Sequence, residues 1–131
     1  MKMELTISTT KRQELVDITH KVEEILAKSG TKEGLCNIYV PHATAAVMIN
    51  ENADPNIGLD ILDALDKMVK SGGWRHDRID NNAAAHIKSA IIGPSETIPI
   101  KNSQLTLGTW QNIFLVELDG PRKRTIMVTI R

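Results

Sequence analysis

The sequence contains one cysteine, Cys36, and few aromatic residues. A single cysteine excludes an intramolecular disulfide, so the chain suits the reducing environment of the cytoplasm. Only Tyr39, Trp74, Trp110 and Phe114 are aromatic, so a core has to be built from Ile, Leu, Val and Ala. A chain of 131 residues fits one domain, and self-association is one way in which a small domain buries more apolar surface.

The sequence also lacks an excess of charge of either sign and any long apolar run. Sixteen basic residues balance sixteen acidic residues, which argues against binding of nucleic acid or an anionic membrane through bulk charge. No apolar run approaches the length that spans a bilayer. Residues 1–15 become charged without the apolar segment of a signal peptide. We therefore expect a cytoplasmic protein that binds neither nucleic acid nor membrane.

The apolar pattern predicts short strands mixed with three helices. Helices are expected over 16–30, from Asp54-Pro55 to the Gly72-Gly73 pair, and over 82–93. Either Asn81 or Asn82 is expected to cap the third helix. Strands are expected over 4–9, 34–40, 45–50, 95–100, 104–108, 112–118 and 124–130. This order predicts one α+β domain of residues 1–131 with a mixed, largely antiparallel sheet.

Polar groups flank the predicted strand 45–50 at both ends. His42 and Thr44 precede it, and Asn50, Glu51 and Asp54 follow, with Asp54 expected as the N-cap of a helix. The two groups are about 25 Å apart if the chain is extended. Three arrangements are open: the chain bends, the two ends serve different pockets, or His42 of one subunit meets Glu51 of another.

Three histidines are candidate metal ligands. Imidazole suits zinc and other transition metals, and carboxylates such as Glu51 suit harder ions such as Mg²⁺. The spacing of His42, His76 and His86 matches no short metal-binding motif, so their convergence depends on the fold. For any single histidine, a hydrogen bond in the core or a place at the surface is the stronger interpretation. His20, among polar neighbours, is expected to face solvent.

The strand 112–118 carries a carboxylate on an otherwise apolar face. Glu117 shares that face with Ile113 and Leu115, and a buried carboxylate is costly unless it is paired or ligated. The alternatives are a paired or metal-bound carboxylate and a carboxylate that simply faces water at the strand end. Arg122 and Arg124, in or after the following turn, are candidate ligands for phosphate.

Two further positions leave alternatives open. Trp110 and Gln111 follow Gly108 at a strand break, where they could line a pocket, although Trp110 could equally belong to the core or to a subunit contact. Cys36 fits a buried, inert thiol. A nucleophilic pair of Cys36 and His42 is the alternative, but nothing in the sequence lowers the pKa of the thiol.

Several motifs together resemble one known family. The segments "HATAAVMINENADP", "RHDRIDNNAAAHIKSAIIGPSETIPI" and "LTLGTWQNIFLVELDGPRKR" are similar, in this order, to the YjbQ family of uncharacterised proteins, also described as secondary thiamine-phosphate synthase. The resemblance implies a compact α+β homotrimer with a pocket near a subunit interface. It implies functional roles for His42, Thr44, Asn50, Glu51, Asp54, His76, His86, Trp110 and Gln111. Ala43 departs from the family's common H-T-T-A or H-T-S-A, which removes one hydroxyl and with it one potential substrate contact.

Three functions follow as hypotheses. The first is a transferase with weak thiamine-phosphate synthase activity on small phosphorylated metabolites. The second is a metal-dependent hydrolase that uses His42, His76 and His86 to hold Zn²⁺ or Mg²⁺. The third is a trimeric metabolite-binding protein without enzymatic activity. The expected catalytic residues are His42, Glu51 and His86, and the expected substrate-binding residues are Thr44, Asn50, Asp54, Trp110, Gln111, Arg122 and Arg124.

Overall fold

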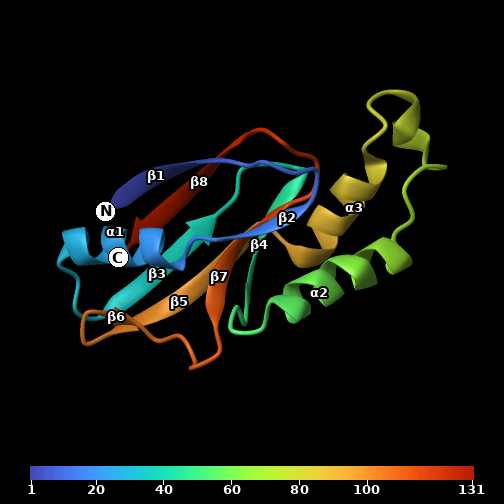
Figure 1. The fold of residues 1–131 in the computed structure, drawn as a ribbon. Coiled ribbons are helices and arrows are strands. Elements are labelled where there is room, and N and C mark those ends of the chain that lie inside the picture. Colours follow the sequence, from blue (N-terminus) through green and yellow to red (C-terminus); the bar gives the residue numbers. More distant parts are fainter.

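Eight strands and three α-helices make up the computed structural model, which describes residues 1–131 (Figure 1). The strands are β1 (Lys2–Ser8), β2 (Glu14–Asp17), β3 (Gly34–Tyr39), β4 (Ala45–Asn50), β5 (Ser95–Lys101), β6 (Gln104–Leu105), β7 (Asn112–Glu117) and β8 (Lys123–Ile130). The helices are α1 (Thr19–Ser29), α2 (Pro55–Met68) and α3 (Ala83–Ile92), and the short 3₁₀-helix η1 (Arg75–Arg78) precedes α3.

The strands form two sheets in which every pairing is antiparallel. One sheet has the order β1-β8-β3-β5-β6 and the other has the order β2-β7-β4. The α+β domain with three helices and the largely antiparallel pairing are confirmed, but the predicted parallel component of the sheet is absent. A parallel pair needs a helical crossover within one sheet. Here the chain changes sheets each time it passes through helices, from β2 through α1 to β3 and from β4 through α2 and α3 to β5.

The structure has three layers. The two sheets enclose the main core, to which β8 contributes Ile126, Val128 and Ile130 and β7 contributes Ile113 and Leu115. The opposite face of the smaller sheet packs against α3 through a second cluster of Ala46, Ala85, Val116 and Leu118. Because β7 lies between these two clusters, Ile113 to Leu118 are all buried. Helices α2 and α3 lie at one end of the molecule and α1 lies at the other (Figure 1).

The strand β2 was missed by the sequence analysis. Residues 16 and 17 were assigned to the first helix. In the structure β2 pairs with β7, from Glu14 opposite Glu117 to Asp17 opposite Phe114. A four-residue strand has too little sequence of its own to be recognised, and its conformation is decided by its partner.

The helix caps are partly as predicted. Asp54 accepts the Asn56 backbone N–H at 2.9 Å, which confirms it as the N-cap of α2. Gly30 ends α1 in the left-handed region with φ of 67°. Asn82 is the N-cap residue of α3, which confirms one of the two predicted positions, but its side chain makes no cap bond and Asp77 instead accepts the Ala83 N–H at 3.0 Å. The side chain of Asn82 is therefore free to bond elsewhere.

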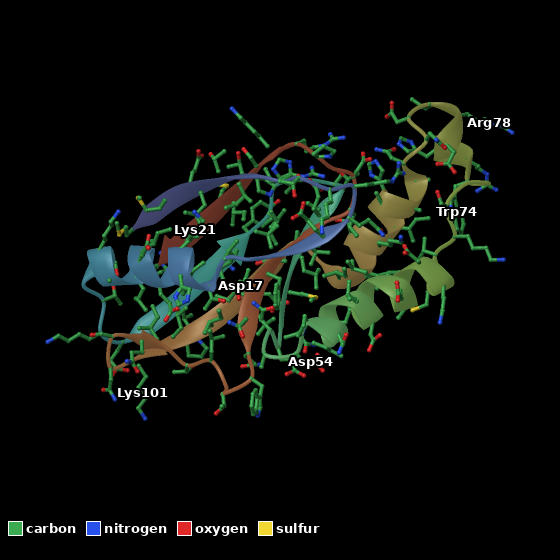
Figure 2. The ribbon with its side chains drawn as sticks, viewed as in Figure 1. Asp17, Lys21, Asp54, Trp74, Arg78 and Lys101 are labelled. Atoms are coloured by element: carbon green, nitrogen blue, oxygen red, sulfur yellow. The ribbon has the colours of Figure 1, made fainter.

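Helix α2 buries little of its apolar surface. Only Leu65 is buried along its length, whereas Leu59 and Met68 are 60% and 68% exposed. Figure 2 shows Asp54 at one end of this helix and Trp74 beyond the other. No helix of the structure combines the length and the hydropathy that a membrane crossing requires.

Candidate functional site

Strand β4 separates the predicted site residues into two groups. It pairs with β7 without interruption from Ala45 opposite Glu117 to Asn50 opposite Asn112. The predicted alternative of a bend within this segment is therefore wrong. The five residue steps of the strand place its two ends about 17 Å apart. Within one chain, the His42 and Glu51 groups belong to different places on the surface.

At the amino-terminal end of β4, a buried ion pair joins the two sheets. Arg124 on β8 is 2% exposed and Glu117 on β7 is fully buried. The Arg124 Nε donates to both carboxylate oxygens of Glu117 at 3.0 Å, and a second guanidinium nitrogen also reaches Glu117. The same guanidinium donates to the hydroxyl and carbonyl oxygens of Thr44, at 2.9 and 3.0 Å. Thr9 completes this group, called the Glu117 cluster below, by donating to Glu117 at 2.7 Å.

The Glu117 cluster fixes the charge of its carboxylate. Burial by itself raises the pKa of Glu117. The hydrogen bonds from Arg124, from Thr9 and from the Asp119 backbone lower this pKa by more than burial raises it, so the net pKa lies below the ordinary value. Glu117 is therefore a charged carboxylate whose oxygens are fully used inside the protein. The alternative of a carboxylate facing water is excluded, and Thr44 and Arg124 are internal partners of Glu117 instead of exposed substrate contacts.

His42 lies beside this cluster as a neutral imidazole. Its Nε2 accepts the Thr125 backbone N–H at 2.9 Å. Because an amide can only donate here, Nε2 carries no proton and the proton of the neutral ring is on Nδ1. Burial lowers the pKa of His42, and the positive charge of Arg124 lowers it further. His42 thus offers a neutral N–H donor at Nδ1.

The β7–β8 turn connects this region to α3. Asp119 accepts a hydrogen bond from the Asn82 side chain at 2.9 Å and from the Arg122 guanidinium at 3.1 Å. The side chain of Arg122 is half exposed, with a relative accessibility of 51%. A fixed orientation combined with exposure leaves the Arg122 guanidinium able to contact an anion.

The structure brings His76 and His86 into contact. Their ring centroids are 4.7 Å apart in an edge-to-face arrangement. The Nε2 atom of His76 is buried without a hydrogen-bond partner and lies 3.7 Å from Asp80 Oδ2, which is too long for a hydrogen bond. His20, in contrast, is 97% exposed in its side chain, as predicted.

The predicted three-histidine metal site does not form within one chain. No group of three His, Cys, Asp or Glu side chains lies close enough to hold a metal ion. His76 and His86 supply two neighbouring imidazoles, but zinc sites use three or four protein ligands. The residues of a single chain therefore do not fit a complete zinc site.

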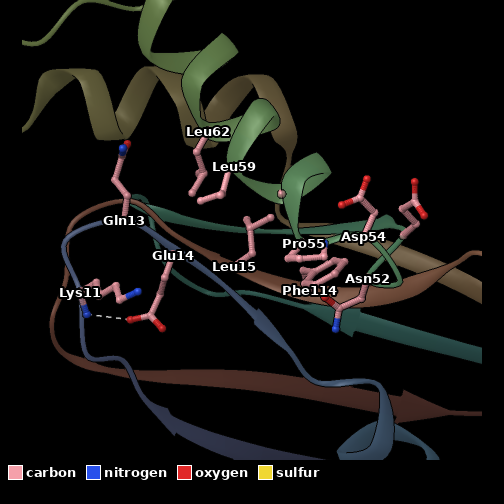
Figure 3. Close-up of a pocket in the computed structure, with 12 residues that line it drawn as sticks. Lys11, Gln13, Glu14, Leu15, Asn52, Asp54, Pro55, Leu59, Leu62 and Phe114 are labelled. Carbon is pink, nitrogen blue, oxygen red and sulfur yellow. Dashed lines mark hydrogen bonds between the residues drawn. The ribbon is translucent and has the colours of Figure 1, made fainter.

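At the carboxyl-terminal end of β4, Glu51 lies between two hollows. One is a cavity of about 250 Å³ between β2 and α2. In Figure 3 its apolar side chains, including Leu15 and Leu62, lie between a rim with Lys11 and Glu14 and a rim with Asn52 and Asp54. The other is an open depression of about 420 Å³ that is lined by Ile49, Asn50, Glu51, Trp110 and Gln111.

The depression brings part of the predicted set together. Asn50, Glu51, Trp110 and Gln111 share it, and Trp110 is 66% exposed, so it does not belong to the core of this chain. Two of these side chains are engaged locally: Asn50 accepts the Glu51 N–H at 2.8 Å and Gln111 accepts the Gly108 N–H at 2.8 Å.

The sequence analysis missed the roles of several residues around the Glu117 cluster and the β7–β8 turn. Thr9, Asp119 and Asn82 all bond to predicted site residues or to their partners. Threonine and asparagine carry no sequence signal that separates these roles from turns and caps. Asp119 lies in a turn three residues before Arg122, so the sequence could have indicated it as the ion-pair partner of Arg122.

The fold and the site together define a small α+β protein in which two antiparallel sheets are joined by a buried ion pair beside a neutral histidine. The sequence model of one family, described as UPF0047 protein YjbQ-like, matches residues 3–131. The chain belongs to this family, as the resemblance predicted. The UPF0047 protein MJ1081 of Methanocaldococcus jannaschii is 45% identical over 130 residues, which cover 99% of this chain and 94% of that protein.

Solved structures of similar proteins have the same fold. A YbjQ-like protein of unknown function from Sulfolobus solfataricus P2 has a TM-score of 0.96 and 45% identity, covering 99% of this chain and 95% of the other. A YjbQ/UPF0047 family protein from Clostridium acetobutylicum has a TM-score of 0.95 and 41% identity, covering 98% and 99%. These relatives establish the family and the fold.

Proposed function

We propose that the chain is an enzyme of small phosphorylated metabolites, and that its reaction is of the thiamine-phosphate synthase type. The observation that carries the proposal is the state of His42. Its Nε2 accepts the Thr125 N–H. The neutral ring therefore carries its proton on Nδ1, which remains able to donate a hydrogen bond. A neutral imidazole donor can stabilise negative charge that develops on an oxygen without first losing or gaining a proton.

The surroundings of His42 supply the rest of the site. Arg122 is held by Asp119 and remains half exposed, so its guanidinium can bind phosphate oxygens in a fixed geometry. The Glu117 cluster acts as a positioning group, because Arg124 holds Glu117 and Thr44 together behind His42. His86 belongs to the same proposal as an acid–base group on α3, next to His76.

The proposed reaction forms one bond and breaks one bond. The nitrogen lone pair of the thiazole phosphate forms a C–N bond with the methylene carbon of hydroxymethylpyrimidine diphosphate. The C–O bond to the diphosphate breaks, and its electron pair leaves on pyrophosphate. Negative charge therefore grows on the leaving oxygen, where the His42 Nδ1–H and the Arg122 guanidinium would stabilise it.

Steady-state release of pyrophosphate from both substrates, with Mg²⁺ supplied, tests this proposal. We expect turnover by the wild type and a loss of about a hundredfold or more in His42→Ala, since removal of one such donor typically has that effect. His20→Ala is the matched control, because that histidine is exposed. A kcat/KM orders of magnitude below about 10⁴ M⁻¹s⁻¹ in the wild type would reject this reaction as the native one.

One observation favours a metal-dependent hydrolase as a second candidate. His76 and His86 lie in contact, which is the start of a ligand set that a further group from another copy of the chain could complete. Elemental mass spectrometry of untagged wild type and His86→Ala tests it. Near-stoichiometric zinc in the wild type and its loss in the variant would support this candidate, and a metal-free wild type would reject it.

We also propose that the chain assembles as a homotrimer in the cytoplasm. Leu59 and Met68 on α2 and Trp110 near the Glu51 depression are large apolar side chains that the single chain leaves exposed. Burial of such surface is a main driving force for subunit association. Assembly could also bring the Glu51 group of one chain to the His42 group of the next. Tight stabilisation by a phosphorylated ligand without turnover would instead favour a trimeric binding protein.

A further inference from the structure

A second polar cavity lies between α2, α3 and the segment that joins β1 to β2. Its volume is about 400 Å³, which is within the range of small-molecule pockets. Three basic side chains, Arg12, Lys70 and Lys88, line it. The other lining residues are Gln13, Asp66, Val69, Ser71, Ala84, Ala85 and Leu118.

Lys88 is a buried charged residue in the lining of this cavity. Its side chain is only 6% exposed, and a lysine is rarely buried to this extent without a specific partner. Its ammonium donates to Gln13 Oε1 at 2.8 Å and to Asp66 Oδ1. An ammonium has three hydrogens to donate, so these two bonds leave one for a further acceptor.

The charge of the cavity favours an anion. Arg12, Lys70 and Lys88 give three positive charges and Asp66 gives one negative charge, a local excess of two. The whole chain has a net charge of zero, so this concentration is local. An ion pair that merely ties α2 to α3 accounts for Lys88 and Asp66. It leaves unexplained why Arg12 and Lys70 line the same cavity.

This cavity is distinct from the region of His42. Leu118 lines it from the outer face of the smaller sheet and packs there with Ala85. Glu117, the preceding residue, bonds to Arg124 between the two sheets. Since successive residues of a strand point to opposite faces, β7 separates the two sites.

We infer that this cavity binds a phosphate group, either free phosphate or the phosphate of a small monoester. Arg12 and Lys88 supply charge-assisted donors, and the Ser71 hydroxyl adds a neutral one. Ala84 and Ala85 belong to the first turn of α3, where the helix carries partial positive charge. Val69 and Leu118 give apolar wall for the remainder of a monoester. The inference does not depend on the reaction proposed at His42.

Calorimetric titration at constant ionic strength tests the inference, with inorganic phosphate and ribose 5-phosphate as probes. We expect saturable binding by the wild type and at least about a tenfold weakening in the double variant Arg12→Gln/Lys70→Gln, because two charge-assisted contacts are removed. Both side chains are exposed, so the variant should keep its fold, which circular dichroism checks. Tighter binding of the monoester would identify an organic ligand, and equal binding would identify free phosphate.

Two matched variants separate the possible outcomes. Lys67→Gln removes an exposed lysine of α2 that does not line the cavity, and it should bind like the wild type. Arg122→Gln removes the exposed arginine near His42, so it should weaken only phosphate binding at the proposed His42 site and keep the binding that depends on Arg12 and Lys70. The inference is overturned if the wild type shows no saturable binding in the millimolar range, if the double variant binds like Lys67→Gln, or if only Arg122→Gln loses binding.

Discussion

Glu117 and Arg124 form a buried ion pair that bridges the two sheets, with the Arg124 Nε at 3.0 Å from each carboxylate oxygen. The two residues are seven positions apart along the chain, on either side of the β7–β8 turn. Thr44, which lies just before β4, accepts a hydrogen bond from the same guanidinium. The pair thereby fixes three segments beside His42, and its integrity is a condition for the geometry of the whole site.

Replacing Glu117 with Gln should destabilise the protein strongly. The substitution leaves the Arg124 guanidinium buried without a counter-charge, and breaking a buried pair in this way typically costs about 3–5 kcal/mol. Urea denaturation gives the free energy of unfolding. Glu24→Gln is the control, since Glu24 is exposed on α1. A loss below about 1 kcal/mol would show that the pair contributes as little as a surface salt bridge.

The same pair should make stability sensitive to acid. The pKa of Glu117 is lowered in the folded state, with burial opposing the shift and the bonds from Arg124 and Thr9 producing it. The stabilisation that the charged Glu117 contributes is therefore present above the ordinary glutamate pKa of about 4.3. It is lost as pH falls through the pKa of Glu117 in the folded state. The difference in unfolding free energy between the wild type and Glu117→Gln should shrink in that window. A difference that is constant down to low pH would contradict it.

His42 should add a second pH dependence near neutrality. Burial and the charge of Arg124 lower the pKa of His42, so the unfolded chain binds a proton before the folded chain does. The stability is complete above the ordinary histidine pKa of about 6.5 and is lost as pH falls from there through the folded pKa. We expect a shallower decline in His42→Gln, in which the amide oxygen can still accept the Thr125 N–H. Denaturation at several pH values measures this, and His20→Gln should leave the wild-type slope unchanged.

Cys36 should be inert until the protein unfolds. It is fully buried, and burial raises the pKa of its thiol to about 11, so almost no thiolate is present near neutral pH. Reaction with a chromogenic disulfide reagent should be slow in native protein and fast in denaturant. Rapid labelling of the native state would show that β3 opens readily or that the thiol is activated. In the second case, a nucleophilic pair of Cys36 and His42 would explain the reactivity.

The exposed surface of α2 should control assembly. Leu59→Lys places a charge on a side chain that is 60% exposed in the single chain, so it should not affect folding of the subunit, whereas a charge in a subunit interface is costly. Sedimentation velocity should show a trimer for the wild type and smaller species for the variant. Leu35→Lys, at a 50% exposed position on β3, tests whether the effect is specific to α2. A wild-type monomer would reject the proposed assembly.

The sequence by itself determined the features that depend on neighbouring residues. The strand over 124–130 and the Asp54-Pro55 start of α2 follow from local residue pattern and capping, and both were predicted. The family was also evident, because its motifs are short and lie in a fixed order along the chain. Such features need no knowledge of which distant segments meet.

Only the tertiary structure decided which distant groups meet. It assigned β2 to β7, made every strand pair antiparallel, and turned Arg124 from a candidate phosphate ligand into the internal partner of Glu117. It also brought Lys88 together with Arg12 and Lys70 in the lining of one cavity. Each outcome depends on contacts between residues that lie in different strands or helices. Local propensity does not encode such contacts, because burial and pairing are properties of the assembled layers.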